Sequence, residues 1–307
     1  MHELEQGFRA RVLLVEDNPD DAELFAGTFG GHGDGPFHIT HVDSLTSALE
    51  ELKQRPPDII LLDLGLPDSS GLATLGSVLD AGRAVPVAVM TGMDDEEIAL
   101  QAVRAGAQDY IVKGLADNRT VARILRHAIE RHRLLTELDE ARRQEAFRAT
   151  HDTVTGLANR SLFYDRLDHI LARATRYHES FAIAFLDLDS FKEINDVHGH
   201  LRGDQVLRDF AARLRHQTRN SDTLARMGGD EFAILMERIG SREAAERHVR
   251  GLLDRIRQPF TGDGPPLSIT ASFGIATYPE DGQVGSDLLR AADRAMYLRK
   301  GARARDP

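Results

Sequence analysis

The chain has 307 residues, which at roughly 150 residues per domain predicts two domains, each with a core of its own. Its 49 acidic residues outnumber its 38 basic residues, and the net charge of −11 argues against a nucleic-acid partner. The absence of cysteine excludes disulfides, thiolate zinc sites and a cysteine nucleophile, and no apolar run approaches the ~18 residues of a membrane span. We therefore expect a cytoplasmic protein, not bound to membrane or nucleic acid, whose metals sit on oxygen or histidine.

The first domain is predicted to be an α/β domain with a five-stranded, doubly wound parallel sheet. Between residues 11 and 115, short apolar runs alternate with amphipathic stretches, which is typical of successive βαβ units. Several runs are almost continuous in valine, isoleucine and leucine, as expected for strands that helices cover on both faces. The predicted strands are Arg11–Val15, His38–Val42, Asp58–Leu62, Val85–Met90 and Tyr110–Val112.

Polar residues gather where these predicted strands end. They are Glu16, Asp17, Asp63, Thr91 and Lys113. Because ligands of doubly wound sheets bind at the carboxyl ends of the strands, we expect these side chains at one rim. Three carboxylates held together either share protons or bind a hard cation such as Mg²⁺, and a metal-bound carboxylate facing a lysine is suited to accept a phosphoryl group. The alternative is that each acid only caps a helix or a turn.

The local sequences closely resemble the receiver domain of response regulators over residues 9–128. The matching segments are Leu13–Asn18, Ile59–Asp68 with Gly71, Met90–Gly92 and Asp109–Lys113. The resemblance implies that Asp63 takes phosphate from a cognate histidine kinase. It implies a magnesium or manganese site made by Glu16, Asp17, Asp63 and the backbone carbonyl of Gly65, and a switch made by Thr91, Tyr110 and Lys113. The sequence departs from the family at Gly114, where a proline usually follows the lysine; this departure bears on the rigidity of the loop.

A long charged helix, continuing the last receiver helix, is predicted over residues 118–150, which contain no glycine or proline. Asn118 is expected to cap its N-terminus. Apolar residues at alternating three- and four-residue steps, with arginines at two further positions, favour a coiled-coil-like parallel dimer. The alternative is a solvated helix with one face packed on the receiver. The seam residues are Val121, Ile124, Ala128, Leu135 and Leu138, with Arg131 and Arg142.

The second domain is predicted to span residues 151–307 and to contain a strand beside a hairpin. The apolar run Phe181–Asp189 predicts a strand that ends in acids, and a helix is expected to begin near Gly203. Two further runs, Thr223–Met227 and Phe232–Met236, flank a Gly-Gly-Asp turn, which predicts a β-hairpin.

A second acidic cluster is predicted at this turn. If the strand lies beside the hairpin, Asp187, Asp230 and Glu231 converge, and without cysteine or paired histidine the cluster favours Mg²⁺ over zinc. Lys192 and Asn195, a turn beyond Asp187, are suited to contact a phosphate and a base edge. The alternative is a type I′ turn with solvated acids.

The segment Gly228–Phe232 is the signature of the GGDEF family of diguanylate cyclases, which the chain resembles over residues 147–301. The resemblance implies an α/β domain with a mostly antiparallel sheet, related to nucleotidyl cyclases and polymerase palms. It also implies condensation of two GTP molecules to cyclic di-GMP with release of two pyrophosphates, which requires two such domains face to face and hence a homodimer. Further matching segments are Asp152–Arg160, Asp187–Asp189, Phe191–Asp196, His198–His200 with Gly203 and Asp204, and Ala291–Tyr297.

This resemblance implies roles for individual residues. Asp187, the carbonyl of Leu188 and Asp230 are implied to hold Mg²⁺ or Mn²⁺ against the triphosphate. Glu231, the other implied catalytic residue beside Asp230, either ligates a second metal ion or helps to deprotonate the attacking 3′-hydroxyl. The implied substrate-binding residues are Asn195 and Asp204 at guanine, Lys192 and Lys300 at phosphate, and Phe191 and His200 beside them.

An Arg-x-x-Asp motif, Arg219 to Asp222, stands five residues before the Gly-Gly turn, where many such cyclases carry an inhibitory product site. Arginine can clamp a phosphate or guanine edge in a bidentate manner, and the aspartate can accept from guanine. The alternative for the motif alone is a surface ion pair. The sequence thus predicts a phosphorylation-controlled diguanylate cyclase inhibited by its product, and the alternative is a silent GGDEF module that senses GTP or cyclic di-GMP.

Overall fold

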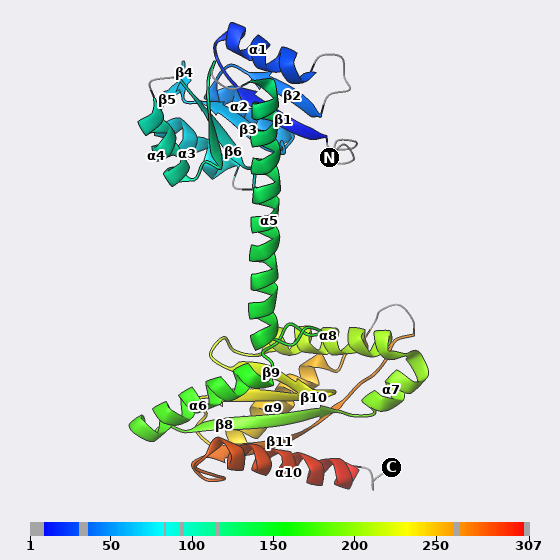
Figure 1. Cartoon of the computed structure of the whole chain (residues 1–307). Helices are drawn as coiled ribbons and strands as arrows, with labels where there is room; N and C mark the ends of the chain where they lie inside the picture. The colour runs from blue at the N-terminus through cyan, green and yellow to red at the C-terminus, as the bar shows by residue number, and fades with distance from the viewer. Residues whose placement is uncertain are drawn as a thin grey trace. The chain divides into compact units, whose positions relative to one another are not determined.

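The computed structural model describes residues 9–30, 36–82, 84–92, 95–114, 117–260 and 265–303. The chain divides into two compact units, Met1–Ala141 and Arg142–Pro307, and the boundary falls inside one long helix (Figure 1). The last four residues of the predicted second domain lie outside the described residues.

The first unit contains a five-stranded sheet with helices on both faces. Its strands are β1 (Ala10–Val15), β2 (Phe37–Val42), β3 (Ile59–Asp63), β6 (Val87–Thr91) and β7 (Asp109–Val112), and its helices are α1 (Pro19–Gly30), α2 (Leu45–Gln54), α3 (Leu72–Ala81), α4 (Glu96–Ala105) and the start of α5 (Asn118–Thr150). A two-residue hairpin, β4 (Gly65–Leu66) and β5 (Ser69–Ser70), follows β3.

This sheet confirms the predicted doubly wound architecture. Its order is β2-β1-β3-β6-β7, and every neighbouring pair is parallel. Apolar residues of one face pack against α1 and α5, and those of the other face pack against α2, α3 and α4. Burial on both faces explains the nearly continuous apolar runs. The predicted strands agree with the observed ones to within two residues at each end.

The predicted long helix is present as α5, but its cap differs from the prediction. The helix has 33 residues, which at about 1.5 Å per residue corresponds to roughly 50 Å. The cap is Asp117, whose Oδ1 accepts a hydrogen bond from the backbone N–H of Thr120 at 2.8 Å. The prediction that Asn118 caps the helix is therefore wrong by one residue. Although α5 is long, it is strongly charged, and the described part of the chain holds no helix with the length and apolar character to cross a membrane.

The predicted seam along α5 is wrong for its first half. Val121 and Ala128 are buried in the core of the first unit, together with Leu125, which the predicted pattern did not include. Arg131 donates a hydrogen bond to the carbonyl oxygen of Gln108. The first turns of α5 therefore pack on the parallel sheet of the first unit, as in the alternative interpretation, and the predicted seam between two copies is left with residues beyond Arg131. The exposed leucines there are Leu134, Leu135 and Leu138.

The second unit is built on an antiparallel sheet. Its strands are β8 (Phe181–Leu188), β9 (Thr223–Gly228), β10 (Glu231–Glu237) and β11 (Ala271–Tyr278), in the order β11-β8-β10-β9. Its helices are α6 (Arg160–Tyr177), α7 (Phe191–His198), α8 (His200–Gln217), α9 (Arg242–Ile256) and α10 (Gly285–Arg303). Helices α6 and α10 cover one face, and α8 and α9 cover the other. The predicted strand and hairpin are confirmed as β8, β9 and β10.

Strand β11 lies at one edge of this sheet, where α10 and two arginine side chains contact it. Arg242 Nη1 donates to the carbonyl oxygen of Ile275 at 3.0 Å, and Arg299 Nη1 donates to that of Phe273 at 3.3 Å. Gly274 lets α10 lie against the strand, because a Cβ at this position would overlap the backbone carbonyl of Ala292.

Candidate functional site

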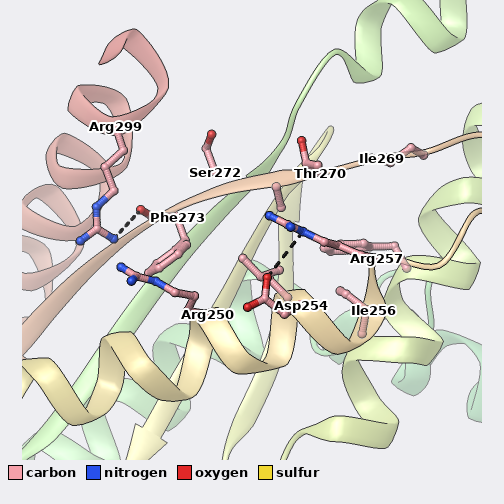
Figure 2. A pocket seen from close by; sticks show the side chains of 12 residues that line it. Arg250, Asp254, Ile256, Arg257, Ile269, Thr270, Ser272, Phe273 and Arg299 are labelled. Atoms are coloured by element: carbon pink, nitrogen blue, oxygen red, sulfur yellow. Dashed lines mark hydrogen bonds and ion pairs between the residues drawn. The ribbon is translucent and has the colours of Figure 1, made fainter. Parts of the chain in front are cut away.

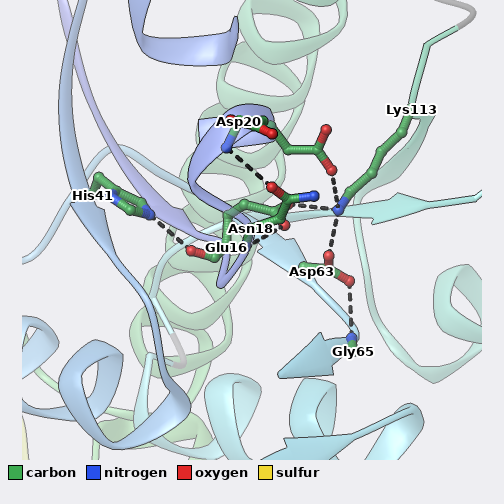
Figure 3. Close-up of polar contacts among 8 residues, drawn as sticks. Glu16, Asn18, Asp20, His41, Asp63, Gly65 and Lys113 are labelled. Atoms are coloured by element: carbon green, nitrogen blue, oxygen red, sulfur yellow. Dashed lines mark hydrogen bonds and ion pairs between the residues drawn. The ribbon is translucent and has the colours of Figure 1, made fainter. Parts of the chain in front are cut away.

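The first candidate site lies where β1 and β3 end, at the rim of the parallel sheet (Figure 3). Ligand oxygens of Glu16, Asp17 and Asp63 lie within 4.8 Å of one another, and the side chain of Glu16 is fully buried. Because β1 and β3 are parallel neighbours, their carboxyl ends bring the three acids to the same edge. Three carboxylates at this separation fit a hard divalent cation, which prefers oxygen ligands.

A lysine from the end of β7 reaches into this cluster. Nζ of Lys113 lies 2.6 Å from Glu16 Oε2 and 3.1 Å from Asp21 Oδ2, and it also donates a hydrogen bond to Asp63. Burial would lower the pKa of Lys113, but the hydrogen bonds to Asp63 and Glu16 outweigh it and raise the pKa well above its ordinary value. Burial raises the pKa of Glu16, with Lys113 opposing the shift. One ammonium thus balances part of the negative charge at the rim.

Asp63 is fixed by its neighbours on both sides. Its Oδ1 accepts a hydrogen bond from the N–H of Gly65 at 2.8 Å, so that Oδ2 faces Lys113. Thr91, at the end of β6, is buried, and its hydroxyl has no hydrogen-bond partner within the described residues. Tyr110 lies half-buried on the adjacent β7. The expected phosphoacceptor and switch residues therefore lie on three neighbouring strands.

The residue after Lys113 has a backbone conformation that requires glycine. Gly114 has φ of +78°. Proline fixes φ near −65°, so this backbone could not carry the proline that is usual in the family. The glycine that replaces the usual proline after Lys113 therefore matches the positive φ of the backbone at this position.

The second candidate site lies at the turn between β9 and β10. The register places Glu231 opposite Asp187 of β8, and the N–H of Leu188 donates to the carbonyl oxygen of Asp230 at 3.2 Å. The Asp187 carboxylate forms an ion pair with Lys300 of α10. Across the residues that the structure describes, only Glu16, Asp17 and Asp63 bring three ligand oxygens within 4.8 Å of one another. The register therefore brings Asp187, Asp230 and Glu231 to one place, while their carboxylates stand further apart than those of the first site.

Burial and mutual repulsion mark the acids at this turn. Burial raises the pKa of Glu231, and the charges of Asp187, Asp293 and Asp230 raise it further. Burial also raises the pKa of Asp187, against the lowering effect of Lys300. Glu231 and Asp293 line a cavity of about 220 Å³. A set of crowded carboxylates with only oxygen donors fits Mg²⁺ or Mn²⁺.

The Gly-Gly turn itself is held by an arginine. Gly228 and Gly229 have φ of 145° and 52°, a region that side chains disfavour. Arg226 donates from Nε and Nη2 to the carbonyl oxygen of Gly229 at 2.9 and 2.7 Å, and from Nη1 to both carboxylate oxygens of Asp152 at 3.0 and 3.1 Å. Asp152 also accepts hydrogen bonds from the N–H and hydroxyl of Thr155. Arg226 thus ties the turn to the loop before α6.

The residues expected at guanine meet where α7 faces α8. Asn195 of α7 lies against Gly203 of α8, where a Cβ would overlap the Asn195 Oδ1 atom. Only glycine therefore allows the amide this position. Asp204 follows Gly203 and is half-buried, and Phe191 is buried in the core. The remaining two expected contacts, Lys192 and His200, are exposed on α7 and α8.

The Arg-x-x-Asp motif lines a polar cavity of about 600 Å³ beside α6. Arg219 and Asp222 both face it. Asp222 accepts a hydrogen bond from the N–H of Glu237 at 3.3 Å, and burial raises the pKa of Asp222. Further cationic side chains that line the cavity are Arg166, Arg173 and Arg215.

Sequence reasoning missed two residues that organise these sites. Asp21 is the third carboxylate on Lys113, and its place in the first turn of α1, four residues after Asp17, was the available signal. Arg226 holds the Gly-Gly turn, and its place two residues before the first glycine was the signal there.

Comparison with known proteins matches both halves of the chain. A model of the diguanylate cyclase GGDEF domain matches residues 149–305, and a model of the response regulator receiver domain matches residues 12–126. The bifunctional diguanylate cyclase/cyclic di-GMP phosphodiesterase MucR of Pseudomonas aeruginosa is 44% identical over 167 residues, which is 54% of this chain and 24% of MucR. The response regulator PleD of Caulobacter vibrioides is 30% identical over 309 residues, which is 96% of this chain and 65% of PleD.

A solved structure of the GGDEF domain of TpbB from Pseudomonas aeruginosa is 42% identical, covers 50% of this chain and 89% of that chain, and has a TM-score of 0.48. The chain spans 24% of the length of MucR and 65% of that of PleD. The receiver model and the GGDEF model follow one another in the order of the two units, and the GGDEF model alone covers half of the chain. The chain is a response regulator with an N-terminal receiver domain, and it belongs to the GGDEF family of diguanylate cyclases.

Proposed function

We propose that this protein is a diguanylate cyclase that condenses two GTP molecules into cyclic di-GMP with release of two pyrophosphates, under the control of Asp63 phosphorylation. The observation that carries the proposal is the register of Glu231 opposite Asp187, directly beside the Gly-Gly turn and with Lys300 on the Asp187 carboxylate. Relatives that match over the same half support it, since TpbB is a diguanylate cyclase and MucR is named as a bifunctional one.

In this proposal the acids at the turn hold the metal and perform the proton transfer. Asp187, the Leu188 carbonyl, Asp230 and Glu231 hold Mg²⁺ or Mn²⁺, which stabilises charge on the attacking and leaving oxygens. Asp230 and Glu231 are the proposed catalytic residues. The pKa of Glu231 is raised by burial, which suits either a metal ligand or a general base for the 3′-hydroxyl.

Substrate contacts come from α7, α8 and α10. The Asn195 amide and the Asp204 carboxylate are proposed to bind guanine, while Lys192 binds phosphate and Phe191 and His200 flank the nucleotide. The ammonium of Lys300 pairs with the Asp187 carboxylate when no substrate is bound. When Asp187 serves as a metal ligand, the ammonium is available to a phosphate oxygen of GTP.

A homodimer follows from the reaction proposed, because each GGDEF domain holds one GTP and the product has two phosphodiester bonds. Phosphorylation by a cognate histidine kinase is proposed to act through the receiver rim. The unsatisfied hydroxyl of Thr91 and the ammonium of Lys113 would both bind a phosphoryl group on Asp63, and Tyr110 would follow Thr91. Cyclic di-GMP is proposed to inhibit the enzyme through Arg219 and Asp222.

The decisive measurement is turnover of GTP with Mg²⁺, followed by chromatography of cyclic di-GMP and by pyrophosphate release. We expect two pyrophosphates per product, a rate per chain that rises with protein concentration, and a gain on treatment with beryllofluoride. Glu231→Gln should abolish product. Glu193→Gln, which changes an exposed acid of α7, is the matched control. Absence of product from the treated wild-type protein at every concentration refutes the cyclase proposal, and retained binding of GTP or cyclic di-GMP would then identify a silent sensor module.

Two variants separate control and inhibition from catalysis. Asp63→Asn should keep basal turnover and lose the gain from beryllofluoride, and an undiminished gain would show that control does not pass through Asp63. Arg219→Ala should relieve inhibition by added cyclic di-GMP. Inhibition as strong as in the wild type would remove Arg219 from the inhibitory site.

A further inference from the structure

A cavity of about 360 Å³ lies in the second unit between α9, the first half of β11 and the end of α10 (Figure 2). None of the residues that line it belongs to either candidate site. Its volume is in the range of about 300–1,000 Å³ that is usual for small-molecule pockets. The cavity therefore has the size of a ligand site that the proposed cyclase reaction does not use.

The floor of the cavity is apolar. Its side chains belong to the hydrophobic core of the sheet face covered by α8 and α9. Contact with an apolar body would remove the exposed parts of these side chains from water, which is favourable by about 25 cal/mol per Å². The floor consists of Phe210, Leu253, Ile256, Ile269, Ala271 and Phe273.

The rim of the cavity is cationic, although the whole chain carries a net charge of −11. It has three guanidinium groups and one carboxylate, that of Asp254, which lies 3.5 Å from Arg257 in an exposed pair. Arg299 stacks on Phe273, with its Cζ 4.7 Å from the ring centroid, and pairs with a glutamate outside the cavity. Arg250 forms no hydrogen bond or ion pair with any residue in the described ranges. Figure 2 shows the head groups of Arg250 and Arg299 pointing toward Phe273.

The hydroxyl groups near the cavity are engaged elsewhere. Thr270 and Ser272 donate hydrogen bonds to the Asp189 carboxylate at 2.5 and 2.7 Å, and Figure 2 shows both side chains pointing away from α9. The polar groups left to a ligand are therefore mainly guanidinium N–H groups, which donate and cannot accept. A ligand that satisfies them needs an acceptor, and a charge-assisted pair favours an anionic one.

We propose that this cavity binds a small anion with an apolar body, whose acidic group pairs with Arg250 and Arg299 while its body packs on Phe273 and Leu253. Both halves of the ligand contribute to its affinity. A purely polar anion would leave the apolar floor in water, and a neutral apolar molecule would gain no charge-assisted hydrogen bond from the exposed Arg250. The site stands on the geometry of the GGDEF unit alone, so it holds or fails independently of the cyclase activity.

The test uses the full-length protein and 8-anilinonaphthalene-1-sulfonate, a fluorescent anion with an apolar body, as the probe. Arg250→Gln should weaken its saturable binding about tenfold, which corresponds to about 1.4 kcal/mol, and Arg250→Glu should weaken it further. Arg247→Gln is the matched control, because Arg247 is an exposed arginine of the same helix that does not line the cavity. The neutral analogue N-phenyl-1-naphthylamine should bind the wild type and Arg250→Gln with equal affinity.

The comparison between variants separates this cavity from other apolar surfaces, such as the exposed leucines of α5. Equal probe affinity in the Arg250 variants and in Arg247→Gln would overturn the proposal, since the probe would then bind elsewhere. Loss of the neutral analogue in Arg250→Gln would also overturn it, because the arginine would then act through the shape of the cavity and not through its charge. Circular dichroism of the Arg250 and Arg247 variants verifies that they fold.

Discussion

The contact between Arg226 and Asp152 is expected to hold the Gly-Gly turn in place. The perturbation is Arg226→Gln, which removes the ion pair with Asp152 and two hydrogen bonds to the Gly229 carbonyl. Asp152→Asn removes the charge from the other side while leaving an oxygen for Thr155. Combining the two variants in a double-mutant cycle isolates the interaction between Arg226 and Asp152.

Burial sets the size of the effect. The side chains of Arg226 and Asp152 are 11% and 22% exposed, so the pair lies between exposed ion pairs, worth about 0–1 kcal/mol, and buried hydrogen bonds to charged groups, worth about 1.5–3 kcal/mol. Thr155 continues to satisfy Asp152 in the absence of the arginine, which limits the loss. We therefore expect a coupling free energy of about 2 kcal/mol, equivalent to roughly 30-fold in an opening equilibrium.

The assay is hydrogen exchange of the backbone amides of residues 223–237, read by mass spectrometry, because local opening is measured there without assuming that the two domains unfold together. Arg133→Gln is the control, since its ion pair with Glu137 on α5 is exposed on both sides and contacts nothing in this segment. Burial would raise the pKa of Asp152, but the hydrogen bonds from Thr155 and Arg226 outweigh it and lower the pKa. The coupling should therefore be complete above the ordinary aspartate pKa of about 3.9 and fade as the pH falls below it. A coupling under about 0.5 kcal/mol at pH 7 would refute the reasoning, because non-interacting sites add within that margin.

Three further changes give outcomes that follow from single contacts. Asp21→Asn removes one anionic partner of Lys113 and should slow phosphorylation of Asp63 by acetyl phosphate up to about fivefold, the equivalent of about 1 kcal/mol for a pair whose side chains are 21% and 33% exposed. An unchanged rate would mean that the contact does not position the lysine. Gly203→Ala should displace the side-chain amide of Asn195 and raise the KM for GTP about tenfold with little change in kcat. An unchanged KM would contradict the proposed contact between Asn195 and guanine. Gly274→Ala should lower the melting temperature, because overpacking against the α10 backbone costs at least about 1–3 kcal/mol. The melt is followed by circular dichroism, since the chain has no tryptophan. An unaltered melting temperature would show that α10 moves aside freely.

Much of the fold could be predicted from the sequence because local signals agree with the final packing. The five parallel strands are buried on both faces, so their apolar runs are long enough to be found at the correct places. The hairpin from Thr223 to Glu237 has glycines at its turn, where positive φ values require them. The seam along α5 was mispredicted because a three-and-four spacing indicates an apolar face without saying what covers it. Val121 and Ala128 are covered by the receiver sheet of the same chain.

Site residues that belong to a short sequence motif could be predicted, whereas an interaction with a residue from a distant segment could not. Glu16, Asp17 and Asp63 follow strands that are neighbours, so their proximity could be derived from the strand order expected of the fold. The pairing of Lys300 with Asp187 spans 113 residues and depends on how α10 crosses the sheet. The hydrogen bonds from Arg226 to the Gly229 carbonyl depend on the path of the backbone at the turn, and the only signal for them in the sequence was the place of Arg226 two residues before Gly228.

The arginine contacts along β11 restrict how this protein can associate. An edge strand offers a row of carbonyl and N–H groups that can template a further strand from another chain. On β11, Arg242 and Arg299 already occupy the carbonyl oxygens of Ile275 and Phe273, and their bulk and charge obstruct an incoming backbone. A strand that paired here would have to displace both arginines from the carbonyl oxygens. The outer edge of β11 is therefore a poor template for open-ended, strand-by-strand aggregation.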